Sequence, residues 1–240
     1  MSTHPKVTLV TCKAQPTLFH GEEGLPDELA ARGCDPQIKV WNDPDVDWSD
    51  AGMIVVRSVS DYAQDRRAFL EWTRSLRRVQ NSCDVLDWNS DKHYLKELAA
   101  LGMPTIPTNW LEPAQNLSKH QIHTRFPAFG EFVVKPAVSS GVRDVGRYTT
   151  VDTRQRQAAM RQVQGLLGEG RSVMIQRYVE EIDLHGEISL VFFNGLVSHA
   201  VEKRAALHPS SITDPTVHEA VVTAEPADSV AWKWGEEIRR

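Results

Sequence analysis

The N-terminal part of the chain alternates short apolar runs with one helical stretch. The apolar runs lie at residues 7–12, 38–41 and 53–57, and each is bounded by turn-forming residues, a pattern that predicts buried strands. A helix is expected over residues 26–32, where Gly33 would end it. Strand and helix in this order predict a βαβ unit with a parallel sheet.

Helical spacing of apolar residues follows in the next part of the chain. Residues 65–79 place one apolar stripe at 3.6-residue spacing and predict a core helix; its members are Phe69, Leu70, Trp72, Leu76 and Val79. A second helix is expected over residues 91–101, with Ser90 or Asp91 as the N-cap and Gly102 as the stop. Three prolines then predict a linker, at Pro104, Pro107 and Pro113.

The second half of the chain changes to β-rich patterning with a single long helix. Strands are expected around residues 132–135 and 148–151, followed by a helix over 153–167 that Gly168 and Gly170 close. Further strands are expected at residues 172–179, 187–193 and 196–201, and a helix begins within 227–240. Asn194-Gly195 is a type I′ hairpin signal. This order predicts an α+β lid beside an antiparallel sheet.

The segment from Phe132 to Gly146 carries the strongest indication of chemistry. Its apolar strand delivers Lys135 into a loop of small residues that includes Ser139, Ser140 and Gly141. A strand holds an ammonium group at a fixed depth, and small residues let backbone N–H groups approach an oxyanion. The segment therefore predicts a phosphate-binding loop.

Composition excludes several classes of protein. The 240 residues are 41% hydrophobic and 25% charged, as in an ordinary globular protein, and the net charge of −5 argues against nucleic acid as a partner. The three cysteines contain no Cys-x-x-Cys pair, which favours a reducing, cytoplasmic location over a disulfide framework. No apolar run approaches the roughly 20 residues that cross a bilayer. We read His120 and His123 as surface residues, so no metal site is predicted.

Four segments in order carry a family resemblance. They are Asn89-Ser90-Asp91-Lys92, Gly102-Met103-Pro104-Thr105, Val133-Val134-Lys135-Pro136, and Ile175-Gln176-Arg177-Tyr178-Val179 ahead of Gly186-Glu187. With this series the chain resembles the ATP-grasp family, in particular the carboxylate–amine ligases typified by glutathione synthetase. No Walker pattern occurs in the sequence.

A subgroup resemblance rests on further residues. The chain is similar to the cycloserine-pathway O-ureido-serine cyclo-ligase type through Arg57-Ser58, Phe69-Leu70-Glu71-Trp72, Trp88-Asn89, Gly186-Glu187-Ile188-Ser189-Leu190 and Phe192-Phe193-Asn194-Gly195. The similarity covers about residues 6–205. It implies an α/β (α+β) fold in three parts: a pre-ATP-grasp βαβ domain over residues 1–110, a lid over 111–184, and an incomplete central antiparallel sheet over 185–240.

The resemblance also implies cofactors and roles for individual residues. ATP and Mg²⁺ are the expected cofactors, with Lys92 and Lys135 on the α- and β-phosphates and Gln176, Tyr178 and Val179 in the adenine hinge. Glu187, in preference to Asp183, would accept hydrogen bonds from the ribose. Lys203 and Arg204 would hold the γ-phosphate or an acyl phosphate, and Arg57 and Ser58 would lie on the substrate side.

Simpler interpretations of these residues stay open. Lys92 could be a solvated residue at a helix N-terminus, and Lys135 a strand-edge residue whose stem is buried. Tyr178 suits core packing and a ring contact equally. Lys203 and Arg204 could form an exposed strand end.

The implied reaction is that of a ligase. A carboxylate or similar acid of a small, amino-acid-like substrate would be activated as an acyl phosphate and attacked by an amine; no membrane is expected as a partner, and a homodimer is left open. The metal-binding carboxylates of the family are not found after Lys203, because we interpret the acidic residues there as solvated, namely Glu219, Glu225, Asp228, Glu236 and Glu237. The chain is therefore expected to be either part of a longer ligase or a nucleotide-binding regulatory subunit without turnover. A binding module that uses no nucleotide is the third alternative.

Overall fold

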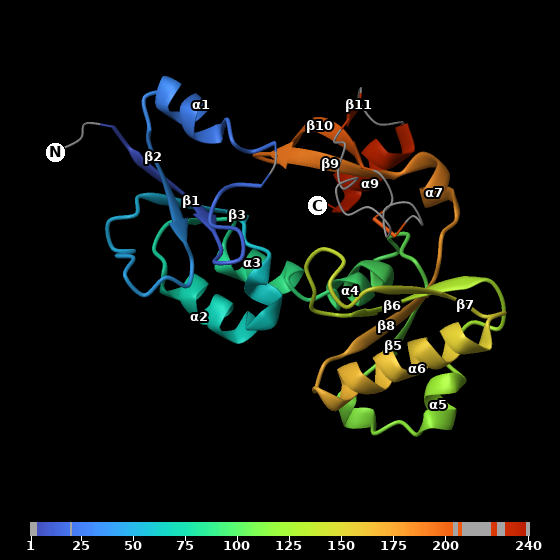
Figure 1. The fold of residues 1–240 in the computed structure, drawn as a ribbon. Coiled ribbons are helices and arrows are strands. Elements are labelled where there is room, and N and C mark those ends of the chain that lie inside the picture. Colours follow the sequence, from blue (N-terminus) through green and yellow to red (C-terminus); the bar gives the residue numbers. More distant parts are fainter. Residues whose placement is uncertain (1–3, 20, 204–205, 208–221, 225–228, 239–240) are drawn as a thin grey trace. The chain divides into compact units, whose positions relative to one another are not determined.

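The structure is a computed structural model that describes residues 4–19, 21–203, 206–207, 222–224 and 229–238 (Figure 1). The chain forms two compact units. Unit 1 comprises Met1–Lys92 and Val138–Arg143, and unit 2 comprises His93–Ala137 and Asp144–Arg240. Each unit has its own sheets and its own core.

Unit 1 is built on a four-stranded parallel sheet with the order β2-β1-β3-β4. The strands are β1 (Lys6–Thr11), β2 (Asp35–Val40), β3 (Met53–Ser58) and β4 (Val79–Gln80). Helix α1 (Leu25–Ala31) connects β1 to β2, as the βαβ prediction requires. Val10 and Ile54 from the sheet pack with Phe69 and Leu70 in the core. The predicted parallel sheet is confirmed.

The helices of unit 1 differ from the prediction at their ends. Helix α2 (Arg66–Ser75) follows the 3-10 turn η1 (Asp61–Gln64) and is capped by Asp65, which accepts a hydrogen bond from Ala68 N at 2.9 Å. The helix predicted over residues 65–79 is too long, because Leu76 is extended and Val79 belongs to β4. The apolar spacing continues past the point where the backbone leaves the helix.

A further helix, α3 (Cys83–Asn89), packs against α2 and was not predicted. Ser90 is the C-cap of α3, so its predicted role as an N-cap of the following helix is wrong. Helix α4 (Tyr94–Ala100) starts three residues later than predicted. Asp91 and Lys92 therefore lie in the junction between two helices, and Gly102 ends α4 in the left-handed conformation that was expected (φ 84°).

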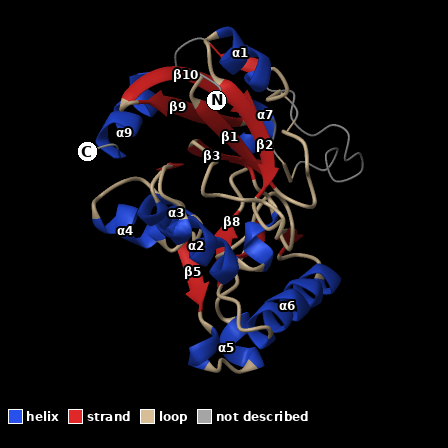
Figure 2. Ribbon diagram, turned by 90° about the vertical axis from the view of Figure 1, so that its left-hand side faces the viewer, coloured by secondary structure: helices blue, strands red, loops and turns tan. Residues whose placement is uncertain are grey.

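Unit 2 contains a four-stranded antiparallel sheet with the order β5-β8-β6-β7. Its strands are β5 (Thr108–Leu111), β6 (Glu131–Pro136), β7 (Gly146–Thr149) and β8 (Val173–Arg177). Helices α5 (Lys119–His123) and α6 (Thr153–Gly168) lie side by side in both views and close the core (Figures 1 and 2). β5 occupies part of the proline-rich segment that was predicted to be a linker, followed by the 3-10 turn η2 (Pro113–Gln115).

A second sheet of unit 2 has three antiparallel strands in the order β11-β10-β9. It consists of β9 (Glu187–Phe193), β10 (Leu196–Lys203) and β11 (Val222–Ala224), with α7 (Glu181–His185) ahead of it. Asn194 and Gly195 both have positive φ, 49° and 77°, as a type I′ turn requires.

Helix α9 (Ser229–Ile238) packs on β9 through a glycine. A Cβ atom at Gly235 would lie 2.8 Å from Leu190 Cδ1 and 2.9 Å from Phe192 Cζ, so no larger residue fits this approach without a shift. The expected helix within residues 227–240 is confirmed. None of the helices that the structure describes is long and apolar enough to span a membrane.

Candidate functional site

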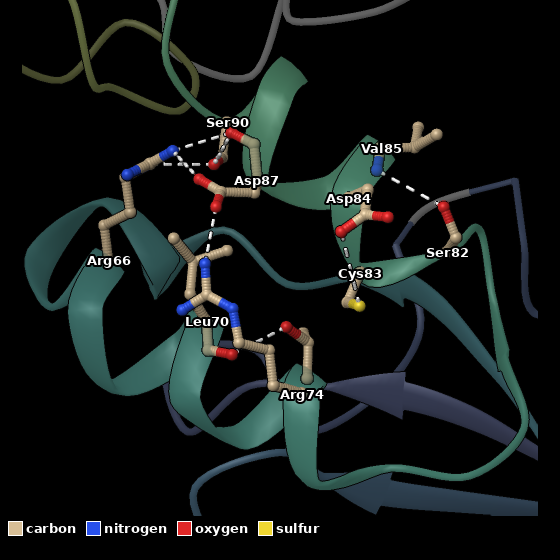
Figure 3. Close-up of polar contacts among 10 residues, drawn as sticks. Arg66, Leu70, Arg74, Ser82, Cys83, Asp84, Val85, Asp87 and Ser90 are labelled. Atoms are coloured by element: carbon tan, nitrogen blue, oxygen red, sulfur yellow. Dashed lines mark hydrogen bonds and ion pairs between the residues drawn. The ribbon is translucent and has the colours of Figure 1, made fainter.

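The turn that carries Lys92 is held in place from α2. Arg66 donates from Nε to Ser90 Oγ at 2.8 Å and from Nη2 to the Asp87 carbonyl oxygen at 2.6 Å and carboxylate at 2.5 Å. Arg74 donates to the second carboxylate oxygen of Asp87 at 2.5 Å (Figure 3). Two guanidinium groups thus fix the end of α3, and the chain enters the Lys92 turn from a fixed point.

Lys92 contacts the loop that follows β6. Its Nζ donates to the Ser139 carbonyl oxygen at 3.0 Å and to Ser139 Oγ at 2.7 Å, and Tyr62 Oη donates to the same carbonyl at 3.1 Å. Ser139 is buried, whereas Ser140 is half-buried and Gly141 is exposed with φ 61°. The open alternative of a solvated Lys92 is therefore wrong, because its ammonium group is hydrogen-bonded to the predicted phosphate loop.

Lys135 lies on β6, which is flanked by β8 and β7 and is not an edge strand. It pairs with Met174 of β8, and burial lowers the pKa of the Lys135 ammonium while the charge of Glu187 opposes that shift. Among the residues that the structure describes, none forms an ion pair with Lys135. A half-buried ammonium group with no direct ion pair in the described residues is suited to an anionic ligand.

The predicted hinge lies where β8 ends. Gln176 is only 5% exposed, and its Nε2 donates to Thr108 Oγ1 at 2.7 Å, so this side chain is tied to β5. The Tyr178 N–H donates to the Glu131 carbonyl at 2.9 Å, and the Val179 carbonyl accepts from Ile182 N at 3.1 Å. These two backbone groups of the hinge are already engaged, while the Val179 N–H has no partner within the described part of the chain.

Tyr178 is held by a polar cluster and not by apolar packing alone. Its hydroxyl donates to the Asp183 carboxylate, and the Arg147 guanidinium carbon lies 3.7 Å from the centre of its ring. Burial and the Asp183 hydrogen bond raise the pKa of Tyr178. Because Asp183 is engaged by Tyr178 and Arg147, Glu187 is the better candidate for the ribose.

A second polar cluster lies at the carboxyl ends of β1 and β3. The buried Ser58 donates from Oγ to Glu22 at 2.8 Å and accepts from the Phe19 N–H at 3.0 Å, and Arg57 forms an ion pair with Glu22. Sequence reasoning named Arg57 and Ser58 and missed Glu22, which has no spacing signal. In α/β sheets ligands bind at this end of the strands.

The remaining predicted residues lie near the end of β10. Lys203 is its last residue and pairs in register with Glu187. Arg204, Glu219, Glu225 and Asp228 lie outside the described residues, whereas Glu236 and Glu237 are on α9. Within the described ranges no three His, Cys, Asp or Glu side chains are grouped so that they could hold a metal ion.

Residues 7–83 match the family described as the N-terminal domain of the D-cycloserine synthetase DcsG. The chain is 37% identical over 195 residues to the cycloserine biosynthesis protein DcsG of Streptomyces lavendulae, covering 79% of this chain. It is also similar to the crystal structure of D-cycloserine synthetase DcsG, with a TM-score of 0.77 and 29% identity over 97% of this chain and 80% of that one.

A structure of a RimK domain ATP-grasp protein from Sphaerobacter thermophilus matches with a TM-score of 0.58 and 14% identity, over 97% of this chain and 98% of that chain. The chain is similar to these proteins in sequence and fold, and the similarity is that of the ATP-grasp ligases. D-alanine–D-alanine ligase from Bacillus anthracis, complexed with ATP, shares this ATP-grasp fold, with a TM-score of 0.54, 15% identity, and coverage of 98% and 74% of the two chains. The predicted family and fold class are confirmed.

The chain spans 61% of the length of the Streptomyces protein DcsG. The site residues named above therefore keep the status of predictions, although the structure brings together Lys92 with Ser139 and Lys135 with Glu187. Sequence reasoning missed Arg147 and Glu131, which lie one residue outside the strands expected at 132–135 and 148–151 and form an ion pair between β6 and β7.

Proposed function

We propose that this ATP-grasp protein binds ATP and serves a ligase reaction in which a carboxylate or similar acid becomes an acyl phosphate that an amine attacks. One observation carries the proposal. Lys92 and Ser139, separated by 47 positions in the sequence, meet through two hydrogen bonds, so a lysine and a small-residue loop predicted to serve one phosphate site converge. The ligase relatives of the same fold support the reaction class.

The cations have separate tasks in this proposal. Lys135 is a half-buried ammonium on an internal strand, and it would neutralise phosphate oxygens as a point charge without a fixed fork geometry. Lys92 would exchange its bonds to Ser139 for a phosphate oxygen. Catalysis would then consist of positioning and charge neutralisation. Mg²⁺, when bound, would supply positive charge that offsets the negative charge developing on transfer.

Other residues are assigned to the transferred phosphoryl group and to the substrate. Lys203 and Arg204 would hold the transferred phosphoryl group and the substrate carboxylate, and Arg57 and Ser58 would face the substrate. The proposed substrates are a small, amino-acid-like acid and an amine. We further propose a cytoplasmic location. Size-exclusion chromatography with light scattering would show whether the chain forms a homodimer.

Calorimetric titration of MgATP tests the nucleotide-binding part of this proposal. The parent chain is expected to bind MgATP, and Lys135→Ala is expected to lose binding because a cation on the phosphates is removed. Lys119→Ala, an exposed lysine on α5, is the matched control and should bind like the parent. A parent chain that binds no nucleotide would overturn the proposal in favour of a module that uses none.

Phosphate release then separates a ligase from a regulatory subunit. ATP is supplied with a panel of amino acids and small hydroxy or ureido acids as acceptors, and inorganic phosphate is measured. Release that depends on one acid and one amine is expected for the ligase. Binding of MgATP without release over the whole panel would support a nucleotide-binding subunit instead.

A further inference from the structure

Arg147 on β7 connects four segments of unit 2. Its Nε donates to Glu131 on β6 at 3.0 Å and its Nη1 lies 2.9 Å from Asp183 Oδ2 on α7. Nη1 also donates to the Leu207 carbonyl at 3.1 Å, and the guanidinium lies over the ring of Tyr178. One side chain therefore contacts β6, the segment after β8, α7 and the segment after β10.

The chemistry of this contact set requires arginine. The side chain is only 11% exposed, and its planar fork faces two carboxylates and a carbonyl while its π face covers an aromatic ring. A lysine would keep the charge, but a single ammonium group cannot reproduce the fork and the stacking together. Removal of the guanidinium would leave Glu131 and Asp183 as partly buried carboxylates without their common partner.

The contacts converge on the hinge. Tyr178 is fixed by its backbone N–H to Glu131, by its hydroxyl to Asp183 and by its ring to Arg147. The Asp183 carboxylate that accepts from the Tyr178 hydroxyl also pairs with Arg147, and so does the carboxylate of Glu131, whose backbone carbonyl accepts from the Tyr178 N–H. Arg147 therefore contacts both the ring of Tyr178 and the carboxylate that accepts from the Tyr178 hydroxyl.

We propose that Arg147 is a positioning residue that holds the segment from Tyr178 to Asp183 in the conformation that binds adenine. The inference rests on the proposed function, because it assigns the hinge to adenine. Arg147 itself touches the hinge, α7 and the segment after β10. Its loss is expected to weaken recognition of the base and to leave recognition of the phosphates intact.

The test compares ATP with tripolyphosphate, which has phosphates and no base. Arg147→Met is expected to raise the dissociation constant for MgATP about tenfold and that for tripolyphosphate by less than about twofold, since Tyr178 and Asp183 in the base-binding segment lose a partner and, within the described residues, neither Lys92 nor Lys135 is a partner of Arg147. Arg147→Lys should fall between Arg147→Met and the parent. The control is Arg171→Met, because Arg171 also pairs with two carboxylates, Asp144 and Glu169, and lies outside the cluster.

Hydrogen exchange supplies a readout that needs no nucleotide. In the ligand-free protein Arg147→Met should speed amide exchange of residues 178–183 about tenfold, and Arg171→Met should not. If Arg147→Met does not fold by circular dichroism, Tyr178→Phe, which removes only the bond to Asp183, takes its place and should show the same two effects at smaller size.

The outcomes separate this inference from the proposed function. A parent that binds tripolyphosphate and MgATP equally, or neither, contradicts the adenine hinge and overturns both. A parent that prefers MgATP, together with an Arg147→Met variant that keeps that preference and the parent's exchange rates, overturns the role of Arg147 alone. Equal loss of MgATP and tripolyphosphate in the variant would make Arg147 a general structural residue and would also overturn the positioning role.

Discussion

At the scale of single residues, Glu112 shows how a fold sets the charge of one group. Its carboxylate accepts hydrogen bonds from Ser172 Oγ at 2.5 Å and Lys96 Nζ at 3.3 Å, and His93 Nε2 lies at 3.0 Å. Burial opposes ionisation, but these three partners outweigh it and lower the pKa of Glu112 to about 2. The residue joins α4, the end of β5 and the start of β8.

The pH dependence of stability follows from this shift. Because the pKa of Glu112 is lower in the folded chain than the ordinary value of 4.5, ionisation stabilises the fold above about pH 4.5, and that contribution is lost as the pH falls towards 2. Glu112→Gln is expected to lower the free energy of unfolding by about 1–2 kcal/mol at pH 7, a value discounted because the side chain is 29% exposed.

Urea unfolding of the parent and Glu112→Gln at pH 7 and pH 3 measures this effect. The difference between the two proteins should shrink at pH 3, where the parent has lost part of the contribution. Glu169→Gln, a surface carboxylate paired with Arg171, is the control and should change stability little. A difference that is the same at both pH values would show that the charge of Glu112 does not stabilise the fold.

Sequence reasoning reached some residues of the site and not others, for a physical reason. Lys135 and the loop from Ser139 to Gly141 could be predicted because strand, lysine and small residues are consecutive. Glu22 and Arg147 could not, since their partners come from other segments of the chain and ordinary charged residues surround them in the sequence. Contacts over long sequence separations have no local pattern.

At the scale of elements, the Lys92 turn depends on the contact between α2 and α3. Asp87 is the only acceptor shown to receive both Arg66 and Arg74 among the described residues, and Arg66 also holds Ser90 (Figure 3). The turn begins directly after that serine. If the end of α3 is less firmly held, the position of Lys92 should therefore also become less fixed, because the two are joined by a short stretch of backbone.

Asp87→Asn tests this link between an element and the site. The amide keeps the shape but removes the charge shared by two guanidinium groups, so unfolding free energy should fall by about 1 kcal/mol and the dissociation constant for MgATP should rise a few-fold. Asp84→Asn on the same helix is the control, because Asp84 is exposed and receives no guanidinium group. Unchanged MgATP affinity in Asp87→Asn, with the expected loss of stability, would show that the contact of Asp87 with Arg66 and Arg74 does not act on Lys92.

Elements were predictable where periodicity and stop signals agree. Helix α6 has a regular pattern, an Asp152 cap and a following Gly170, and both ends were close to prediction. β4 has two residues and β5 lies between prolines, so neither offers a run long enough to reveal its pairing with β3 or β8. Tertiary pairing stabilises these short strands and propensity does not.

At the scale of the whole molecule, the order of the motifs predicted more than any one of them. Lys92, Lys135 and Glu187 each occur in a common local setting, but their sequence order matched one family, and the comparisons confirmed it. The antiparallel pairing of β9 with β10 was also predictable, because Asn194-Gly195 indicates a hairpin.

Whether the protein could bind Mg²⁺ without nucleotide is a question for all of the described residues together. No three His, Cys, Asp or Glu side chains within the described ranges are grouped to hold a cation, while the proposed phosphate site is rich in lysine. Mg²⁺ dehydrates reluctantly and is usually bound through one or two carboxylates together with substrate phosphates. We therefore expect Mg²⁺ to enter with the nucleotide and not before it.

Three titrations check this order. Mg²⁺ alone should give no saturable heat, MgATP should bind, and ATP in EDTA should bind about tenfold more weakly, because unneutralised phosphate charge then rests on the lysines alone. Ca²⁺ alone serves as the control for weak surface binding by carboxylates. Saturable binding of Mg²⁺ without nucleotide would contradict the prediction.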